Sequence, residues 1–272
     1  MKTPMSLNTV SPAIKHDVAQ RLKTLERQEN MHILLAVESG SRAWGFPSPD
    51  SDYDIRFVYI RPRDWYLQLH PGRDVIETPI ENDIDLNGWD IRKALLLLLK
   101  SNAVISEWID SPIRYLPDHP VVQHLSQLAD TVLNARGLAH HYASLGNNAA
   151  ERWLTSDGPV PVKKYFYALR PALAIRCLRL APHSRPPMNL QALVERATLT
   201  PALQEDIATL VAAKARTNER HNTARLPALE ALIKDELHRA PEIPAHTTCN
   251  ATQALAQSNQ IFLDLVNSFP AS

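Results

Sequence analysis

Two aspartates separated by one residue stand at the head of an apolar run. The pair is Asp52 and Asp54, and the run continues to Ile60. Side chains alternate between the two faces of a strand, so both carboxylates and Arg56 are expected on one face. Strand geometry would place the two aspartates about 6–7 Å apart at the backbone. Carboxylates in a buried strand need partners, and an oxygen-preferring divalent cation, Mg²⁺ or Mn²⁺, is one such partner. The pair is therefore a candidate metal site.

A Gly-Ser pair precedes these aspartates. An apolar strand expected over residues 31–38 leads into Gly40 and Ser41, and a polar loop then runs to residue 51. Glycine allows backbone N–H groups to approach a phosphate closely, and the serine hydroxyl is a further donor. Arg42 is a candidate counter-charge. A tight turn with no ligand would explain Gly-Ser equally well. The combination of strand, Gly-Ser, loop and Asp-x-Asp is what supports a nucleotide-phosphate site.

A third carboxylate is expected from a neighbouring strand. Residues 74–80 and 83–90 predict a hairpin, and Asp85 on its second strand fits the role. Asp90 is the rival, because it lies on the opposite parity just before a helix and is equally suited to be the N-cap of that helix. Asp83-x-Asp85 repeats the Asp-x-Asp spacing, which shows that the spacing alone is a weak signal. Asp85 is the favoured third acid, and Asp90 stays open.

Four separated blocks occur in one order along the chain, and together they resemble a known family. The blocks are Gly-Ser-Arg-Ala-Trp-Gly-Phe (40–46), Ser-Asp-Tyr-Asp-Ile-Arg-Phe-Val (51–58), Asn-Gly-Trp-Asp-Ile-Arg-Lys-Ala-Leu (87–95) and Lys-Ser-Asn…Glu-Trp-Ile-Asp-Ser-Pro-Ile (100–113). They resemble the predicted nucleotidyltransferases associated with RNA ligases, the RlaP or YcgL-like family of the DNA polymerase β-like superfamily. The resemblance covers about residues 35–115, with a weaker match at 163–176.

The resemblance implies a polymerase-β-type nucleotidyltransferase. By it, Gly40 and Ser41 match the nucleotide-phosphate loop, and Asp52 and Asp54 match the metal ligands. The implied reaction moves a nucleoside monophosphate from an NTP, with ATP as the expected nucleotide, to an acceptor hydroxyl and releases pyrophosphate. The acceptor would be an RNA end or a protein, and the partner an RNA ligase or a toxin. The alternative is a non-catalytic nucleotide-binding module that acts as an antitoxin, a sensor or an RNA-repair accessory.

The rest of the chain predicts the elements that must position this site. We expect an α+β fold with a small mixed sheet over residues 12–115 and an all-helical domain over 116–272. In the second part, a basic and aromatic helix is expected over residues 162–180. Its Lys163, Tyr167 and Arg170 share one face, which could stack a base and bind a phosphate. Packing of the aromatics on the core explains the same pattern.

Composition narrows the class of protein. The chain has 272 residues, is 44% hydrophobic and has a formal net charge of zero, so bulk electrostatic steering onto nucleic acid is not indicated. Two cysteines make no disulfide framework or metal cluster. No signal-peptide core and no apolar run of about 18 residues are present. We therefore expect a cytoplasmic protein with no membrane partner.

Overall fold

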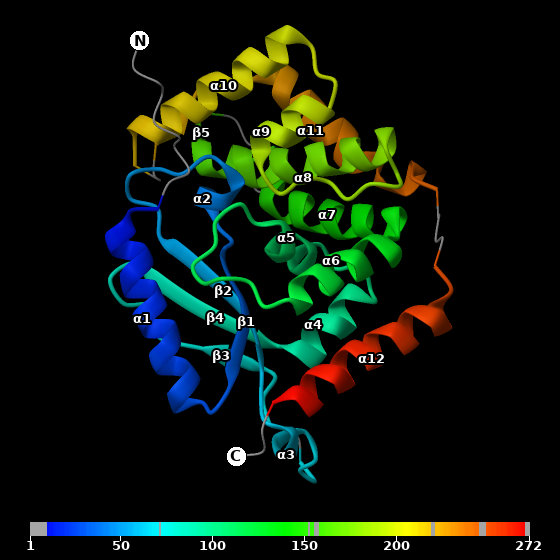
Figure 1. Ribbon diagram of the computed structural model, residues 1–272. Coiled ribbons are helices and arrows are strands. Elements are labelled where there is room, and N and C mark those ends of the chain that lie inside the picture. The colour runs from blue at the N-terminus through cyan, green and yellow to red at the C-terminus, as the bar shows by residue number, and fades with distance from the viewer. Residues whose placement is uncertain are drawn as a thin grey trace, which may run out of the picture. The chain divides into compact units, whose positions relative to one another are not determined.

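The computed structural model describes residues 10–70, 72–151, 153–154, 158–218, 221–244 and 249–269 (Figure 1). Contacts group the chain into two compact units. The sheet unit comprises Thr9–Gly40, Asp52–Val132 and Thr248–Ser272, and the helical unit comprises Ser41–Ser51 and Leu133–Thr247. This grouping by contacts differs from the predicted division at residue 115. The domain bounds 12–115 and 116–272 stay a prediction.

The sheet unit contains a small mixed sheet, as predicted. Its strands lie in the order β1 (His32–Glu38), β2 (Tyr53–Ile60), β4 (Ile84–Asp90) and β3 (Val75–Glu77). The β2–β4 pair is parallel, and the β1–β2 and β3–β4 pairs are antiparallel. The antiparallel β3–β4 pair confirms the predicted hairpin. Because β2 begins at Tyr53, Asp52 lies just before the strand and not inside it.

Helices cover both faces of this sheet. Helix α1 (Pro12–Gln28) begins at the predicted cap, where the Ser11 hydroxyl accepts from Ile14 N. Its Val18, Leu22 and Leu25 join the apolar cluster that holds Ile55 and Phe57 of β2. A second cluster holds Val58 and Ile60 together with side chains of further helices. These helices are α4 (Ile91–Leu98), α5 (Ala103–Asp110), α6 (Val121–Thr131) and α12 (Ala251–Ser268).

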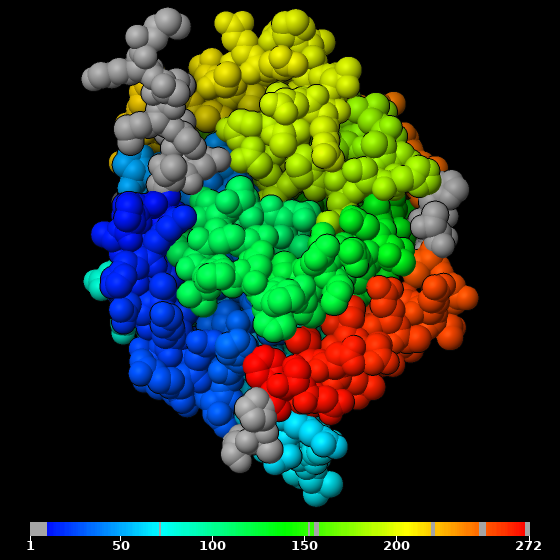
Figure 2. All heavy atoms as spheres, in the orientation of Figure 1, coloured from blue at the N-terminus to red at the C-terminus, as the bar shows by residue number. Residues whose placement is uncertain are grey.

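Two predicted stretches of the sheet unit differ in detail. The apolar pattern over residues 91–102 predicts one helix, but α4 ends at Leu98 and Asn102 caps a new helix by accepting from Val104 N and Ile105 N. The proline-containing stretch 61–72 predicts a loop, and it contains the short helix α3 (Arg63–Tyr66). The outer side of α12 lies at the surface, where it is orange to red in Figure 2, and exposes Leu255 and Leu263.

The helical unit confirms the long helices predicted from the second half of the chain. They are α7 (Ala135–Ala150), α8 (Val162–Leu180), α9 (Leu190–Arg196), α10 (Pro201–Arg216) and α11 (Pro227–His238), followed by the 3₁₀ turn η1 (Ala240–Glu242). Helix α8 continues through Pro171. The described residues also contain an unpredicted ladder of β5 (Val160–Pro161) and β6 (Asn222–Thr223). The loop expected over residues 39–51 contains the one-turn helix α2 (Ser41–Trp44).

Membrane-spanning helices were not expected from the sequence. Among the described residues, no helix combines the length and the apolar character that crossing a bilayer requires.

Candidate functional site

Asp54 and Asp85 lie opposite each other on neighbouring parallel strands. The register between β2 and β4 pairs their Cα atoms, so their side chains leave the same face of the sheet. Both are partly open to solvent, with side-chain exposures of 35% for Asp54 and 27% for Asp85. Asp52 is exposed just before β2. The two carboxylates that the sequence placed on separate strands therefore come together at one place in the sheet unit.

Asp90 occupies a different place on β4. Its register partner is Tyr59, and its side chain is buried. The Asp90 carboxylate caps α4 by accepting from Arg92 N at 2.8 Å, and it accepts from the Tyr66 hydroxyl at 2.7 Å. Burial raises the pKa of Asp90 above its ordinary value, although these hydrogen bonds oppose the shift. The capping role explains Asp90 and leaves Asp85 as the acid beside Asp54.

Arg56 contacts both members of the Asp54–Asp85 pair. Its Nη2 lies 3.2 Å from Asp54 Oδ1 and 2.8 Å from Asp85 Oδ2. The alternation of β2 puts Arg56 on the face of Asp54, as predicted. One guanidinium therefore balances part of the charge of two neighbouring carboxylates.

Gly40 belongs to the sheet unit and lies against Asp54. A Cβ atom built at Gly40 would lie 1.8 Å from Asp54 Oδ2, closer than any non-bonded contact allows. The sequence suggested that glycine lets the backbone approach a phosphate at this position. The structure gives Gly40 a second role, which is to leave room for the Asp54 carboxylate.

Glu38 is a buried acid that the sequence did not indicate as functional. Its Oε1 accepts from Asp54 N at 3.0 Å and Gly40 N at 3.4 Å, and its Oε2 accepts from the Tyr115 hydroxyl at 2.6 Å. Burial raises the pKa of Glu38, and these donors partly oppose the shift. Glu38 thus joins the ends of β1 and β2. A single acid closing an apolar strand was the signal that could have revealed it.

The loop Ser41–Ser51 belongs to the helical unit, where a chain of hydroxyl groups holds it. Ser41 Oγ donates to Ser51 Oγ at 3.1 Å, and Ser48 Oγ lies 2.8 Å from the same atom. Lys214 of α10, which is buried, donates from Nζ to Ser48 Oγ at 3.2 Å. Arg42 Nη2 donates to the Ser51 carbonyl at 2.6 Å. The predicted phosphate residues Ser41 and Arg42 are therefore held in a folded loop.

Aromatic side chains attach this loop to α8. Phe46 stacks on Phe166 with ring centroids 4.4 Å apart and an angle of 11°. Trp44 meets Tyr167 edge-on at 5.5 Å, and the Arg170 guanidinium lies over the Trp44 ring at 4.2 Å. Two of the predicted nucleotide-binding residues on α8 thus contact the loop that holds Ser41 and Arg42.

A pocket of about 550 Å³ opens beside the start of α8. It is lined by Lys163, Lys164 and Tyr167 together with Asn148, Ala149 and Glu151. Lys163 Nζ lies 5.7 Å from the centre of the Tyr167 ring, and Tyr167 is 40% exposed. The predicted basic and aromatic face of α8 is therefore open to a ligand at Lys163 and Tyr167, whereas Arg170 is buried.

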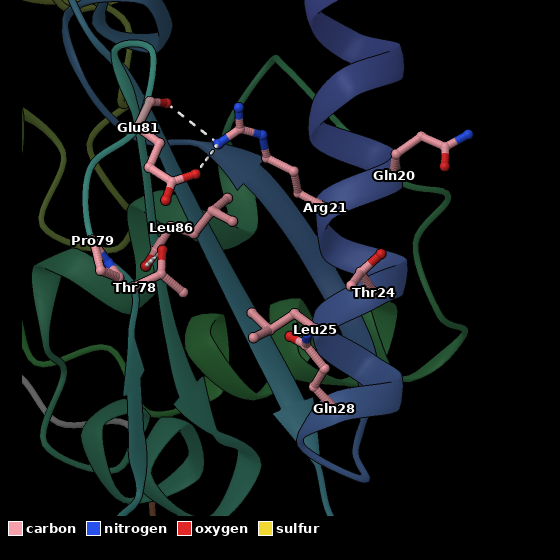
Figure 3. Close-up of a pocket in the computed structure, with 9 residues that line it drawn as sticks. All are labelled: Gln20, Arg21, Thr24, Leu25, Gln28, Thr78, Pro79, Glu81 and Leu86. Carbon is pink, nitrogen blue, oxygen red and sulfur yellow. Dashed lines mark hydrogen bonds and ion pairs between the residues drawn. The ribbon is translucent and has the colours of Figure 1, made fainter.

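Another pocket lies in the sheet unit and is shown in Figure 3. It measures about 330 Å³ and lies between α1 and the β3–β4 hairpin, with the Arg21–Glu81 ion pair along one side. None of the predicted site residues lines it. This pocket is separate from the Asp54–Asp85 pair and plays no part in the candidate site.

Comparison with known proteins identifies the family. A model of the RNA repair pathway DNA polymerase beta family, RlaP, matches residues 14–264. The chain belongs to the RlaP family. The uncharacterized protein YcgL of Bacillus subtilis (strain 168) is 35% identical over 254 residues, which are 93% of this chain and 96% of that protein. Membership confirms the resemblance predicted from the four sequence blocks, and it supports nucleotidyl transfer as the class of reaction.

Comparison with solved structures also gives a match. The crystal structure of a nucleotidyltransferase-like protein from Exiguobacterium sibiricum 255-15 is 13% identical to this RlaP protein. The match covers 93% of this chain and 80% of that chain, with a TM-score of 0.29. A TM-score of this size supports no argument about the fold or the site.

The chemistry of the site suits the divalent cation that a polymerase-β-type RlaP protein implies. Asp54 and Asp85 offer carboxylate oxygens, the ligand type that Mg²⁺ prefers, and both side chains are partly open to solvent. Among the described residues, no group of three His, Cys, Asp or Glu side chains is arranged to hold a metal ion. The carboxylates of Asp54 and Asp85 therefore fit a divalent cation as two of its ligands. Asp52 would have to turn toward them to become a third ligand.

Proposed function

We propose that this protein is a metal-dependent nucleotidyltransferase. It would transfer a nucleoside monophosphate from an NTP, ATP in the first place, to an acceptor hydroxyl and release pyrophosphate. The observation that supports this most is the pairing of Asp54 with Asp85 on adjacent parallel strands. An acidic pair on one face, partly open to solvent, suits a site for a cation that also contacts substrate phosphates.

Mg²⁺ or Mn²⁺ is the proposed cofactor, and Asp54, Asp85 and Asp52 are the residues that would hold it. When bound, such an ion stabilises negative charge on the reacting phosphate oxygens. Asp85 would either complete the ligand set or accept the proton of the acceptor hydroxyl. Glu38 contributes to the position of Asp54 through the hydrogen bond from Asp54 N, and Gly40 contributes because the carboxylate lies where a Cβ atom would otherwise be.

The helical unit is proposed to supply the nucleotide contacts. Ser41 and Arg42 would bind substrate phosphates, for which the Ser41 hydroxyl must exchange its bond to Ser51 for one to the ligand. On α8, the exposed Tyr167 ring would stack on a base and Lys163 would neutralise phosphate charge. Arg170, stacked on Trp44, would contribute by holding that loop beside α8.

RNA is the first acceptor to test, because the family is described as part of an RNA repair pathway. A protein side chain is the second. An RNA ligase or a toxin is the proposed partner, and the cytoplasm is the proposed compartment.

The competing function is a nucleotide-binding module that acts as an antitoxin, a sensor or an RNA-repair accessory. The paired acids argue against it, because nucleotide binding alone would not require two carboxylates beside a nucleotide's phosphates.

One assay separates the two functions. The protein is incubated with each α-³²P-labelled NTP, Mg²⁺ or Mn²⁺, and either RNA or a cell extract as acceptor. Label that becomes attached to RNA or protein supports the enzyme. Saturable nucleotide binding without transfer to any acceptor would favour the module.

A further inference from the structure

Arg56 is anchored from two sides. Its Nη1 donates to the Ile55 carbonyl at 3.0 Å and the Asp85 carbonyl at 3.2 Å. Its Nη2 contacts Asp54 Oδ1 and Asp85 Oδ2. The side chain is 19% exposed. The backbone contacts through Nη1 do not depend on the carboxylates, so they can hold Arg56 when Nη2 moves away.

Arg56 Nη2 contacts one oxygen of each carboxylate that we propose as a metal ligand. A cation held by Asp54 and Asp85 would draw on the same two carboxylates, of which Asp54 Oδ1 and Asp85 Oδ2 accept from Arg56. The guanidinium charge would also repel a divalent ion at this distance. Arg56 and a metal ion are therefore competitors for one pair of carboxylates.

We propose that Arg56 is a positioning residue that acts as an internal counter-cation of the metal site. It holds Asp54 and Asp85 together and sets the metal concentration at which the site fills. This inference rests on the proposed function, because it requires that these carboxylates bind the metal. According to this proposal, metal binding weakens the contacts of Nη2 with the carboxylates. The hydrogen bonds of Nη1 to the Ile55 and Asp85 carbonyls keep the side chain in place.

An ordinary structural ion pair would behave differently. It would lower stability when removed and would leave the affinity for metal unchanged or reduced. Competition requires the opposite, because removing the guanidinium removes a competitor for both carboxylates and a charge that repels the metal ion. The sign of the change in metal affinity therefore separates the two roles.

The test measures Mn²⁺ binding to the full chain without nucleotide, by the EPR signal of free Mn²⁺. Arg56→Met is expected to bind Mn²⁺ at least about tenfold more tightly than the wild type. This figure already allows for solvent screening, which weakens the repulsion between the guanidinium and the metal ion. Arg56→Lys keeps the charge and loses the forked geometry, so a smaller gain is expected. Arg21→Met, which removes the ion-paired arginine of Figure 3, is the matched control and should leave affinity unchanged.

Thermal unfolding supplies a second readout. Arg56→Met should melt at a lower temperature than the wild type in EDTA and should gain more than the wild type from added Mn²⁺. If Arg56→Met proves too unstable to purify, the same comparison is made with Arg56→Lys. Equal or weaker Mn²⁺ binding by the folded variants would overturn the role of Arg56. If Asp54→Asn binds Mn²⁺ as well as the wild type, the metal assignment itself fails, and the inference fails with it.

Discussion

The Asp54 carboxylate fills the space beside Gly40, so closely that a Cβ atom at Gly40 would lie 1.8 Å from Asp54 Oδ2. Gly-Ser and Asp-x-Asp are weak signals when each is taken alone. This contact joins them, because the glycine of one motif makes room for the acid of the other. The antiparallel β1–β2 pair bridges the separation of Gly40 and Asp54 along the chain, because its register ends at Glu38 and Ile55, close to both residues in sequence.

Gly40→Ala should therefore disturb the site more than the fold. The added methyl group must displace the Asp54 carboxylate, at a cost of about 1–3 kcal/mol in unfolding free energy. Mn²⁺ affinity should fall along with it, measured by EPR on the same samples that are used for urea denaturation. Gly137→Ala is the control, since its Cβ would approach only the Asn134 side chain, at 3.3 Å. Wild-type metal affinity in Gly40→Ala would contradict the proposed packing.

Glu38 should matter through the hydrogen bonds that it accepts. Glu38→Ala leaves the buried donors of Asp54, Gly40 and Tyr115 without this partner, and we expect a loss of about 2–4 kcal/mol in unfolding free energy. Glu38→Gln retains one acceptor oxygen and the shape, so its loss should be about 1 kcal/mol or less. Urea denaturation of the two variants checks this order. Equal losses would show that the hydrogen bonds contribute little.

Asp90 predicts a pH dependence of stability. Burial raises its folded pKa above the ordinary value of 3.8, so the folded protein holds this proton more tightly than the unfolded chain. The contribution of Asp90 to the unfolding free energy is therefore largest below about pH 4. It falls as the pH rises through the folded pKa and is constant at higher pH. Asp90→Asn lacks this titration and should keep the cap on α4.

Urea denaturation of both proteins between pH 4 and pH 8 tests the sign. The unfolding free energy of the wild type minus that of Asp90→Asn should decrease as pH rises. A difference that grows with pH would mean that the folded protein favours the ionised carboxylate.

Phe46 anchors the predicted phosphate loop to α8. The ring is 1% exposed and stacks on Phe166, so Phe46→Ala should lower the unfolding free energy by about 3–5 kcal/mol. Phe46→Leu fills more of the space that the ring occupies and should lower the unfolding free energy less. If the loop also binds nucleotide, Phe46→Leu should raise the KM for NTP more than it lowers kcat. Denaturation curves and initial rates measure the two effects, and unchanged stability in Phe46→Ala would remove the anchoring role.

The elements of the fold were largely predictable from periodicity and caps. Ser11 and Pro12 predict the start of α1, and the proline-containing breaks at residues 158–161 and 181–187 predict the observed limits of α8. The division between α4 and α5 was missed, although Lys100, Ser101 and Asn102 interrupt the apolar run there and the Asn102 side chain caps the new helix. The β5–β6 ladder was missed because each strand has two residues, too few to show alternation.

The sequence predicted those features of the site that depend on the alternation of side chains along a strand, here called parity. Parity put Asp54 and Arg56 on one face and separated Asp85 from Asp90. It did not predict that Arg56 contacts both acids, because that contact depends on the register between β2 and β4. The contacts of Glu38 and Lys214 could not be read from the sequence either, since each joins residues that are remote in the chain.

The most direct test of the account is pyrophosphate release from NTP, measured for Asp54→Asn, Asp85→Asn and Asp83→Asn with the acceptor that the transfer assay identifies. Asp83 is the matched control, because it belongs to the second Asp-x-Asp, is exposed and has a positive φ of 61° that asparagine tolerates. We predict that Asp54→Asn and Asp85→Asn each lose at least about a hundredfold in rate while still unfolding cooperatively, and that Asp83→Asn keeps the wild-type rate. Wild-type rates in folded Asp54→Asn or Asp85→Asn would contradict the proposed site.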